Sequence, residues 1–182
     1  MGDTSFMSIN TNWYVITGAP SSGKTKTTEY LAFLGYAAIP EASRILIDIE
    51  RSKGKTTKEI RLDEVEFQRK VFQMKIETET RMPIEQLVFF DGGIPSSVAY
   101  YQLHGLDPTP VIEESRKRKY RTVFILDRLP FEKDYARVED EETVNKLDRL
   151  LYEAYSDLGY EVVRVPPQPI EERVKFILSK IN

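Results

Sequence analysis

Residues 18–25 read Gly18-Ala19-Pro20-Ser21-Ser22-Gly23-Lys24-Thr25, which is the complete G-x-x-x-x-G-K-[ST] pattern of a phosphate-binding loop. Residues 13–17, directly before the loop, are all aromatic or β-branched, as is typical of a buried strand. Residues 25–34 have a spacing compatible with a helix, and Gly35 stands where such a helix would end. The pattern therefore lies between a strand and a helix, the context that it requires, and it predicts a nucleoside-triphosphate binder.

The chemistry of this loop follows from its backbone. The amide groups of a glycine-rich turn can point at phosphate oxygens, and the start of the following helix adds a partial positive charge. We predict that Lys24 reaches the β- and γ-phosphates and that the Thr25 hydroxyl binds Mg²⁺. A chance match in a glycine-containing turn is the alternative, and the strand and helix around the loop disfavour it. The predicted cofactors are ATP and Mg²⁺, bound by Gly18, Ala19, Pro20, Ser21, Ser22, Gly23, Lys24 and Thr25.

Composition limits the other functions that the chain can have. With 182 residues, 41% of them hydrophobic, it can form one domain with a sizeable core. Its net charge of −3 predicts no bulk attraction to nucleic acid, and the absence of cysteine excludes disulfides and thiolate chemistry. No apolar run is long enough to span a membrane, and residues 1–10 do not resemble a signal peptide. We expect a flexible tail over residues 1–10, a single domain over 11–182 and a cytoplasmic location.

Apolar runs alternate with helical segments along the whole chain. This alternation predicts an α/β protein of the three-layer P-loop NTPase type, in which a five-stranded parallel sheet has helices on both faces. The carboxyl ends of all the strands then meet at one edge, where ligands bind. The predicted strands are 13–17, 37–39, 87–91, 122–127 and 161–165, and the predicted helices are 25–34, 41–52, 58–82, 96–103, 110–119, 141–158 and 170–181.

An acidic residue, Asp91, follows the apolar run of residues 87–90. An acid at the end of a strand is the usual second support of the metal in P-loop proteins, so we favour Asp91 as a Mg²⁺ ligand, directly or through water. Capping of the following turn is the alternative role for an Asp at this position. The pair Gly92-Gly93 lets the backbone turn tightly or approach a ligand.

A second acid, Glu41, follows the second predicted strand. Its carboxylate can take the proton from an attacking hydroxyl or help to hold the metal, and its location at a helix start is equally explained by the helix dipole. Arg44 lies three residues further on and projects from the same helix face. It can pair with Glu41 or contact an anion of the substrate.

Two more segments follow strands of the predicted sheet. Residues 127–142 mix arginines and acids, which favours a flap that brings Arg128 and Arg137 over the phosphates; a solvated capping loop is the alternative. Pro166 and Pro167 stiffen the last strand end, which can hold a flat base by backbone contacts or simply connect two elements. The basic run 116–121 is interpreted as a solvated helix end, and the single histidine, His104, as a loop residue.

Taken together, these motifs resemble a small P-loop family that is usually described as an AAA-type ATPase domain and is kinase-like. The family is related to the ribosylnicotinamide kinase domain of the bacterial NAD regulator and, more distantly, to nucleoside and nucleotide kinases. The resemblance covers nearly the whole chain, and only the phosphate loop is highly specific by itself. The matching segments are 18–25, 40–44, 90–100, 124–131, 134, 137, 139–141, 159–163, 165–166 and 172–173.

The resemblance implies a kinase-like core with a short lid and a second pocket for a phosphoryl acceptor. It places Glu41 toward the acceptor and assigns Arg128 and Arg137 to the lid. The chain departs from the family at the third strand, where Asp-Arg-Gly is common, because Gly92 stands at the arginine position and Ser96 or Ser97 replaces a later acid. In nucleoside kinases that arginine helps to hold substrate or phosphate. Its absence here is compatible with a different phosphoryl acceptor or with no acceptor.

Three functional hypotheses follow from the sequence. The first is a Mg²⁺-dependent phosphotransferase that moves the γ-phosphoryl group of ATP to a small hydroxyl-bearing, nucleoside-like metabolite, with Lys24, Glu41, Arg128 and Arg137 as catalytic residues and Glu41 and Arg44 at the substrate. The second is an ATPase without a separate acceptor, and the third is a nucleotide-sensing binding module. The long helix predicted over residues 58–82 can pack on the sheet, line the acceptor pocket or form a homodimer face.

Overall fold

The computed structural model describes residues 8–129 and 140–181. Seven strands are described: β1 (Ile9–Asn10), β2 (Trp13–Thr17), β3 (Ala37–Ile39), β4 (Val88–Asp91), β5 (Arg118–Lys119), β6 (Thr122–Leu126) and β7 (Val162–Val165). The described helices are α1 (Lys24–Phe33), α2 (Ala42–Ser52), α3 (Thr57–Ile60), α4 (Glu64–Arg81), α5 (Ser96–Leu103), α6 (Thr109–Ser115), α7 (Glu141–Ser156) and α8 (Ile170–Leu178).

The central sheet confirms the predicted fold class. Five strands pair in the order β3-β4-β2-β6-β7, and every pairing is parallel. The first strand of this sheet, β2, lies in its middle. The next two strands along the chain, β3 and β4, lie on one side of β2, and the last two, β6 and β7, lie on the other side. This reversal of winding direction is the point at which ligands bind in open α/β sheets, and the phosphate loop begins there.

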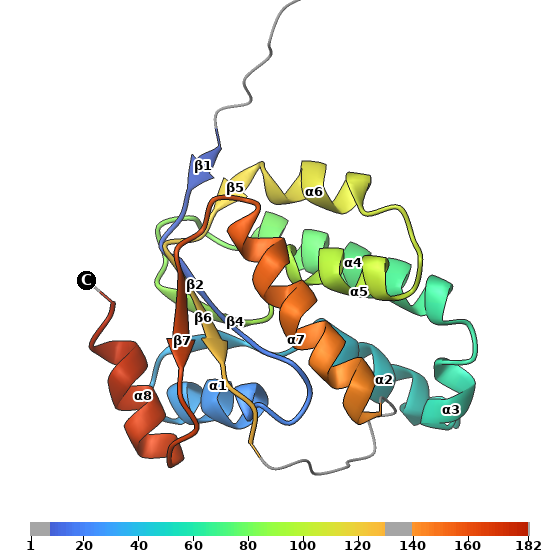
Figure 1. The fold of residues 1–182 in the computed structure, drawn as a ribbon, viewed down its shortest axis with the longest axis horizontal. Helices are drawn as coiled ribbons and strands as arrows, with labels where there is room; N and C mark the ends of the chain where they lie inside the picture. The colour runs from blue at the N-terminus through green and yellow to red at the C-terminus, as the bar shows by residue number, and fades with distance from the viewer. Residues whose placement is uncertain (1–7, 130–139, 182) are drawn as a thin grey trace, which may run out of the picture.

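Alternation along β2 divides the core into two halves. Tyr14 and Ile16 face the layer of α1 and α8, whereas Trp13 and Val15 face the opposite layer, which includes α7. All four side chains are at most 1% exposed, as expected for a central parallel strand that is covered on both faces. Figure 1 shows the sheet between α1 and α8 on one side and α5 and α7 on the other.

The helix predicted over residues 58–82 is two helices, and the single-helix prediction was wrong. The short helix α3 is capped at its start by Thr56, whose hydroxyl accepts from the Glu59 amide while the Glu59 carboxylate accepts from the Thr56 amide. The longer helix α4 is capped at its start by Asp63, whose carboxylate accepts from the Glu66 amide at 2.9 Å. These two caps fix two helix starts inside one apolar periodicity, so the capping residues decide the break.

The structure corrects two further assignments. Ile9 and Asn10, placed by the sequence in a flexible tail, form β1 and pair in parallel with Arg118 and Lys119 of β5. The helix predicted to run to residue 119 accordingly ends at Ser115, because the basic run turns into this small second sheet. Residues 1–7 lie outside the described residues. Among the helices that are described, none is both long and apolar enough to cross a membrane.

Candidate active site

The phosphate loop leaves β2 and enters α1 through a tight turn. Gly23 stands at the helix start with φ of 81°, a left-handed conformation that glycine tolerates best. A side chain there would also collide, because an ideal Cβ would lie 2.9 Å from Nη1 of Arg173. The loop therefore has little room to change, and the glycine in the motif is required by the protein itself as well as by the phosphate.

Arg173, from α8, supports the loop from behind. Its side chain is only 2% exposed, and its guanidinium donates to the backbone carbonyls of Ser22 and Asp127. Burial lowers the pKa of Arg173, with Asp127 acting in the opposite direction, but an arginine remains charged at any ordinary pH. Arg173 is thus a positioning residue that ties the end of β6 and the last helix to the phosphate loop.

Replacing Arg173 with methionine is expected to weaken ATP binding about tenfold and to lower the free energy of unfolding by about 2 kcal/mol. The substitution leaves the buried Ser22 carbonyl without its charged donor, and such bonds contribute about 1.5–3 kcal/mol each. Titration with a fluorescent ATP derivative and urea unfolding measure the two effects. The control is Lys175→Met, since Lys175 lies on the same helix but is exposed; equal effects of the two substitutions would contradict the role of Arg173.

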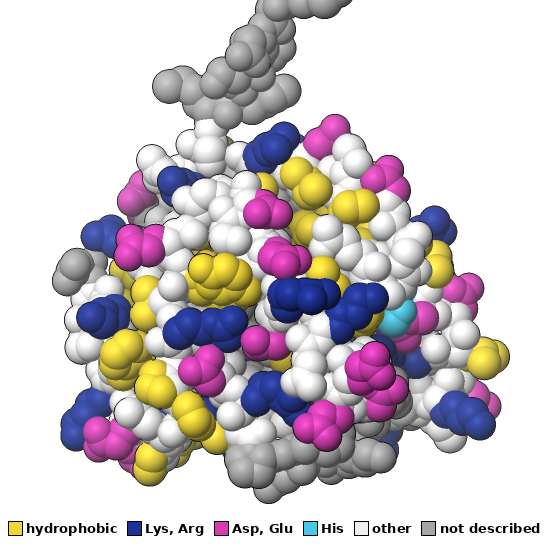
Figure 2. Space-filling view, in the orientation of Figure 1, with side chains coloured by type: hydrophobic (Ala, Val, Ile, Leu, Met, Phe, Trp, Pro, Cys, Tyr) yellow, Lys and Arg dark blue, Asp and Glu magenta, His cyan; other side chains and the backbone are white. Residues whose placement is uncertain are grey.

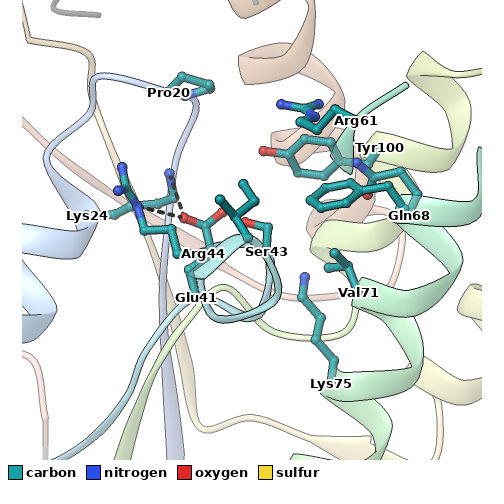
Figure 3. Close-up of a pocket in the computed structure, with 12 residues that line it drawn as sticks. Pro20, Lys24, Glu41, Ser43, Arg44, Arg61, Gln68, Val71, Lys75 and Tyr100 are labelled. Atoms are coloured by element: carbon teal, nitrogen blue, oxygen red, sulfur yellow. Dashed lines mark ion pairs between the residues drawn. The ribbon is translucent and has the colours of Figure 1, made fainter. Parts of the chain in front are cut away.

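Glu41 and Arg44 lie beside the loop lysine, as the sequence predicted for a site at this edge of the sheet. The carboxylate of Glu41 is 3.6 Å from Nζ of Lys24 and 4.0 Å from Nε of Arg44 (Figure 3). Burial opposes ionisation of Glu41, but the cations Lys24, Lys75 and Arg44 outweigh it, so the pKa of Glu41 lies below its usual value. Glu41 is therefore a carboxylate in direct reach of the loop lysine.

Asp91 and Thr25 together offer oxygen atoms that the described part of the chain does not satisfy. Both carboxylate oxygens of Asp91 and the Thr25 hydroxyl are buried and have no hydrogen-bond partner among the described residues. Burial, and then the charge of Glu41, raises the pKa of Asp91 to about 7. Mg²⁺ prefers oxygen ligands, and in phosphate-binding sites it is usually bound by one or two protein oxygens together with water and phosphate oxygens. A buried carboxylate without a hydrogen-bond partner is a suitable protein ligand for it. The residues present therefore fit Mg²⁺ bound by Thr25 and Asp91.

A cavity opens next to Glu41, on the side away from α1. It contains about 600 Å³ of empty space, counted with the solvent at its open side. Its walls come from the phosphate loop, α2, the α3–α4 junction, α4 and α5. The lining residues are Pro20, Lys24, Glu41, Ser43, Arg44, Ile47, Arg61, Phe67, Gln68, Val71, Lys75 and Tyr100, and Figure 3 shows how most of them surround the space.

Sequence reasoning missed the polar groups that α4 contributes to this cavity. Gln68 and Lys75 are 3% and 7% exposed and line the cavity, and both lie on α4, a helix in which the sequence predicted no role for any single residue. Arg61 pairs with Glu64 through two hydrogen bonds of 2.7 and 2.9 Å, and Gln68 donates to the same carboxylate. The signal that could have found them is a polar residue at the helical spacing of Phe67 and Val71, which pack against α2.

The turn after Asp91 is held by a buried network. Lys75 donates to the Gly93 carbonyl, the Gly93 amide donates to the Tyr155 hydroxyl, and the Ile94 amide donates to Glu79 and Tyr120. An ideal Cβ on Gly93 would lie only 2.6 Å from the Tyr120 hydroxyl, so the Tyr120 side chain leaves no room for a side chain at residue 93. The network fixes the backbone that directly follows the candidate metal ligand.

Glu79 gives this network a measurable pH dependence. Burial raises the pKa of Glu79 to about 7 against its hydrogen bonds from Tyr120 and Ile94, whereas the unfolded chain ionises near 4.5. Between these values the native state holds the extra proton, so stability falls as the pH rises and the loss levels off above about 7. We expect Glu79→Gln to be more stable than wild type by about 2–3 kcal/mol at pH 8 and by much less at pH 4.5.

Urea unfolding of wild type and Glu79→Gln across this pH range measures that difference. Glu77→Gln is the matched control, because Glu77 is exposed on the same helix and its substitution removes the same charge. A difference between wild type and Glu79→Gln that stays constant from pH 4.5 to 8 would contradict a raised pKa at Glu79.

The remaining predicted site residues have mixed outcomes. Arg128 donates to Asn145 on α7 and does not line the cavity beside Glu41. The next residue, Leu129, donates its amide to the Ser21 carbonyl of the phosphate loop, and a role of Arg128 over the phosphates stays a prediction. Arg137, like the centre of the predicted flap, lies outside the described residues. Pro166 and Pro167 follow β7 at the carboxyl edge of the sheet, half-buried and exposed respectively. A role of these prolines in holding a base stays a prediction.

The sheet order and the loop geometry define a P-loop protein with a kinase-like fold. A family model described as "AAA domain" matches residues 13–173, and the chain therefore belongs to this family. The family resemblance predicted from the motifs is thus confirmed. No curated protein sequence matches the chain.

Solved structures share the fold at low sequence identity. Deoxyadenosine kinase from M. mycoides has a TM-score of 0.66 at 16% identity, over 93% of this chain and 98% of that one. Shikimate kinase from Acinetobacter baumannii has a TM-score of 0.60 at 21% identity, over 96% and 93%. The NadR protein has a TM-score of 0.67 at 16% identity and matches 97% of this chain, which spans about half of NadR (52%).

Proposed function

We propose that the protein is a Mg²⁺-dependent phosphotransferase that moves the γ-phosphoryl group of ATP to a hydroxyl group of a small metabolite. The observation that carries the proposal is the place of Glu41. Its carboxylate lies 3.6 Å from the loop lysine on one side and lines the cavity on the other. A carboxylate between a phosphate site and a cavity is where a base for an attacking hydroxyl is needed.

The proposed mechanism assigns one task to each group. The loop amides and Lys24 hold the triphosphate with its γ-phosphate toward the cavity, and Lys24 stabilises the charge that develops there. Glu41 orients the acceptor hydroxyl and takes its proton as the oxygen attacks the γ-phosphorus in line. The bond between the γ-phosphorus and the β,γ-bridging oxygen breaks, and ADP leaves. Mg²⁺, held by Thr25 and Asp91, neutralises charge on the phosphate oxygens when it is bound. The cavity walls fix the acceptor, which contributes through proximity and orientation.

The structural neighbours support this proposal by the ligands with which they were solved. The deoxyadenosine kinase, which the match covers over 98% of its length, was solved with its product dCMP. NadR, of which the match covers about half, was solved in complex with NR and, separately, with NAD and AMP-PNP. We infer a nucleoside-like or comparable hydroxyl-bearing acceptor for this chain.

The test is transfer of label from γ-labelled ATP to a panel of hydroxyl-bearing metabolites in magnesium buffer. Wild type is expected to label at least one acceptor, and Glu41→Gln to lower this transfer by about 10²–10⁴-fold while ATP still binds. Glu50→Gln is the control, since Glu50 lies on α2 and pairs with Lys53 and Lys55 away from the cavity. Label that appears only in inorganic phosphate would contradict the kinase proposal.

ATP hydrolysis without an acceptor is the second candidate. It is favoured by Gly92, which offers no side chain at the position where related kinases carry an arginine. In that case ATP turnover would be unaffected by every member of the metabolite panel.

A further inference from the structure

Lys75 brings a buried ammonium group to the acceptor side of the site. It extends from α4, is 7% exposed, and donates to the Gly93 carbonyl at 3.0 Å. Within the described part of the chain, no carboxylate oxygen lies within 4.0 Å of its Nζ, so Lys75 has no ion pair there. An ammonium has three N–H donors, and burial of an unpaired charge is costly. The side chain therefore needs a further acceptor.

The cavity is the place from which this acceptor can come. Lys75 lines it on the wall opposite the phosphate loop, and Figure 3 shows Glu41 lying between Lys24 and Lys75. Burial lowers the pKa of Lys75 to about 8, while the charges of Glu41, Glu79 and Asp91 act against the shift. Lys75 is accordingly still mostly an ammonium at pH 7, on the acceptor side of the proposed base.

Among the charged residues of the cavity wall, Lys75 has no ion pair within the described part of the chain. The charged lining residues are Lys24, Glu41, Arg44, Arg61 and Lys75, so four cations face one carboxylate. Glu41 lies against Lys24 and Arg44, and Arg61 is held by Glu64 through two hydrogen bonds. The other acids near Lys75 are engaged elsewhere, because Glu79 accepts from Tyr120 and Ile94, and Asp91 lies at the candidate metal site.

We propose that Lys75 binds the phosphoryl acceptor and that the acceptor is an anion, a small hydroxyl compound with a carboxylate or phosphate group. This proposal rests on the proposed phosphotransferase function and adds the charge of its substrate. The anionic group of the acceptor pairs with the Lys75 ammonium and so replaces the water that Lys75 loses on burial. The hydroxyl group of the same acceptor then reaches Glu41. The apolar walls formed by Ile47, Phe67 and Val71 exclude water from this pair.

Acceptors that share a sugar but differ in whether they have an anionic group test the proposal. D-ribose, D-ribonate and D-ribose 5-phosphate form one set, and thymidine and thymidine monophosphate form another. Label transfer from γ-labelled ATP and calorimetric binding to the protein loaded with Mg²⁺ and AMP-PNP are both measured. Wild type is expected to bind and phosphorylate an anionic member at least about tenfold better than its neutral partner, and the carboxylate and phosphate arms show which anion is preferred.

Variants of Lys75 separate binding from support of the Gly93 turn. Lys75→Met is expected to raise the KM for the anionic acceptor at least about 30-fold while the KM for ATP changes less than about threefold, and Lys75→Arg to recover part of the loss. A purely structural role through Gly93 would instead disturb the Asp91 turn and raise the KM for ATP. Lys70→Met is the matched control, because Lys70 is exposed on the same helix.

The outcomes distinguish this inference from the proposed function. Transfer to neutral acceptors with equal efficiency would leave the kinase proposal standing and overturn the anionic acceptor. Anion binding that Lys75→Met abolishes, without any label transfer, would support Lys75 as an anion-binding residue and would contradict the kinase proposal. No anionic member binding in the millimolar range, or equal binding by Lys75→Met and wild type, would overturn the inference.

Discussion

Replacing Lys24 with methionine is expected to lower kcat/KM for ATP by about 10²–10³-fold. Lys24 is 8% exposed at the start of α1 and lies 3.6 Å from Glu41, so its charge serves both the γ-phosphate and the proposed base. Removal of one preorganised charge or donor in a site of this kind has effects of this size. Methionine keeps the length and apolar stem of the side chain, so packing changes little.

Steady-state turnover and titration with a fluorescent ATP derivative in magnesium buffer measure this effect. The control is Lys26→Met, because Lys26 is exposed two residues further along the same helix and carries the same charge. We expect the control to behave like wild type. Unchanged ATP affinity and turnover in Lys24→Met would show that the triphosphate does not bind to this loop, and the site assignments that depend on it would be lost.

Replacing Asp91 with asparagine is expected to have opposite effects on activity and on stability. The Asp91 side chain is 1% exposed and its carboxylate has no hydrogen-bond partner among the described residues. In the metal-free protein this buried carboxylate therefore lowers the free energy of unfolding. Asparagine removes the charge at equal volume. We expect the free energy of unfolding in EDTA to rise by about 1–3 kcal/mol and magnesium-dependent turnover to fall about 100-fold or more.

Thermal unfolding in EDTA and in Mg²⁺–ATP, together with turnover, measures both effects. The control is Asp127→Asn, since Asp127 follows a neighbouring strand but its side chain is 40% exposed and pairs with Arg164 at 3.2 Å. An exposed ion pair contributes less than about 1 kcal/mol, so the control is expected to change stability only slightly. Loss of stability in Asp91→Asn would indicate that the carboxylate supports the fold and would contradict its assignment to the metal.

Much of the fold could be predicted because its signals are local. The aromatic and β-branched run of residues 13–17 is the central strand, and the acid that ends β4 lies buried at the carboxyl edge, as the alternation of strands and helices indicated. The break between α3 and α4 was missed although Thr56 and Asp63 are good helix caps, because an apolar periodicity that continues through both helices masked them.

The candidate site was predictable only where its residues follow strands. Glu41 and Asp91 stand directly after β3 and at the end of β4, so the parallel topology brings them to the loop. Lys75 and Arg173 come from the middle of helices, where a charged residue is usually solvated. Only their spacing from buried apolar residues of the same helix, Val71 and Ile177, distinguishes them from exposed neighbours such as Lys70 and Lys175. Arg128 follows a strand as well, yet its side chain turns to α7.

The sequence by itself determined the phosphate loop, the parallel sheet and the acids at its carboxyl edge, because backbone geometry, hydrophobic alternation and right-handed crossovers act over short stretches of chain. Only the tertiary structure decided which helical charges are buried in the site. The packing of α4 against α2 and α5, and of α8 against α1 and β7, removes water from Lys75 and Arg173 and turns them toward Gly93 and Ser22. Burial of a long charged side chain depends on contacts between distant segments, which no local pattern encodes.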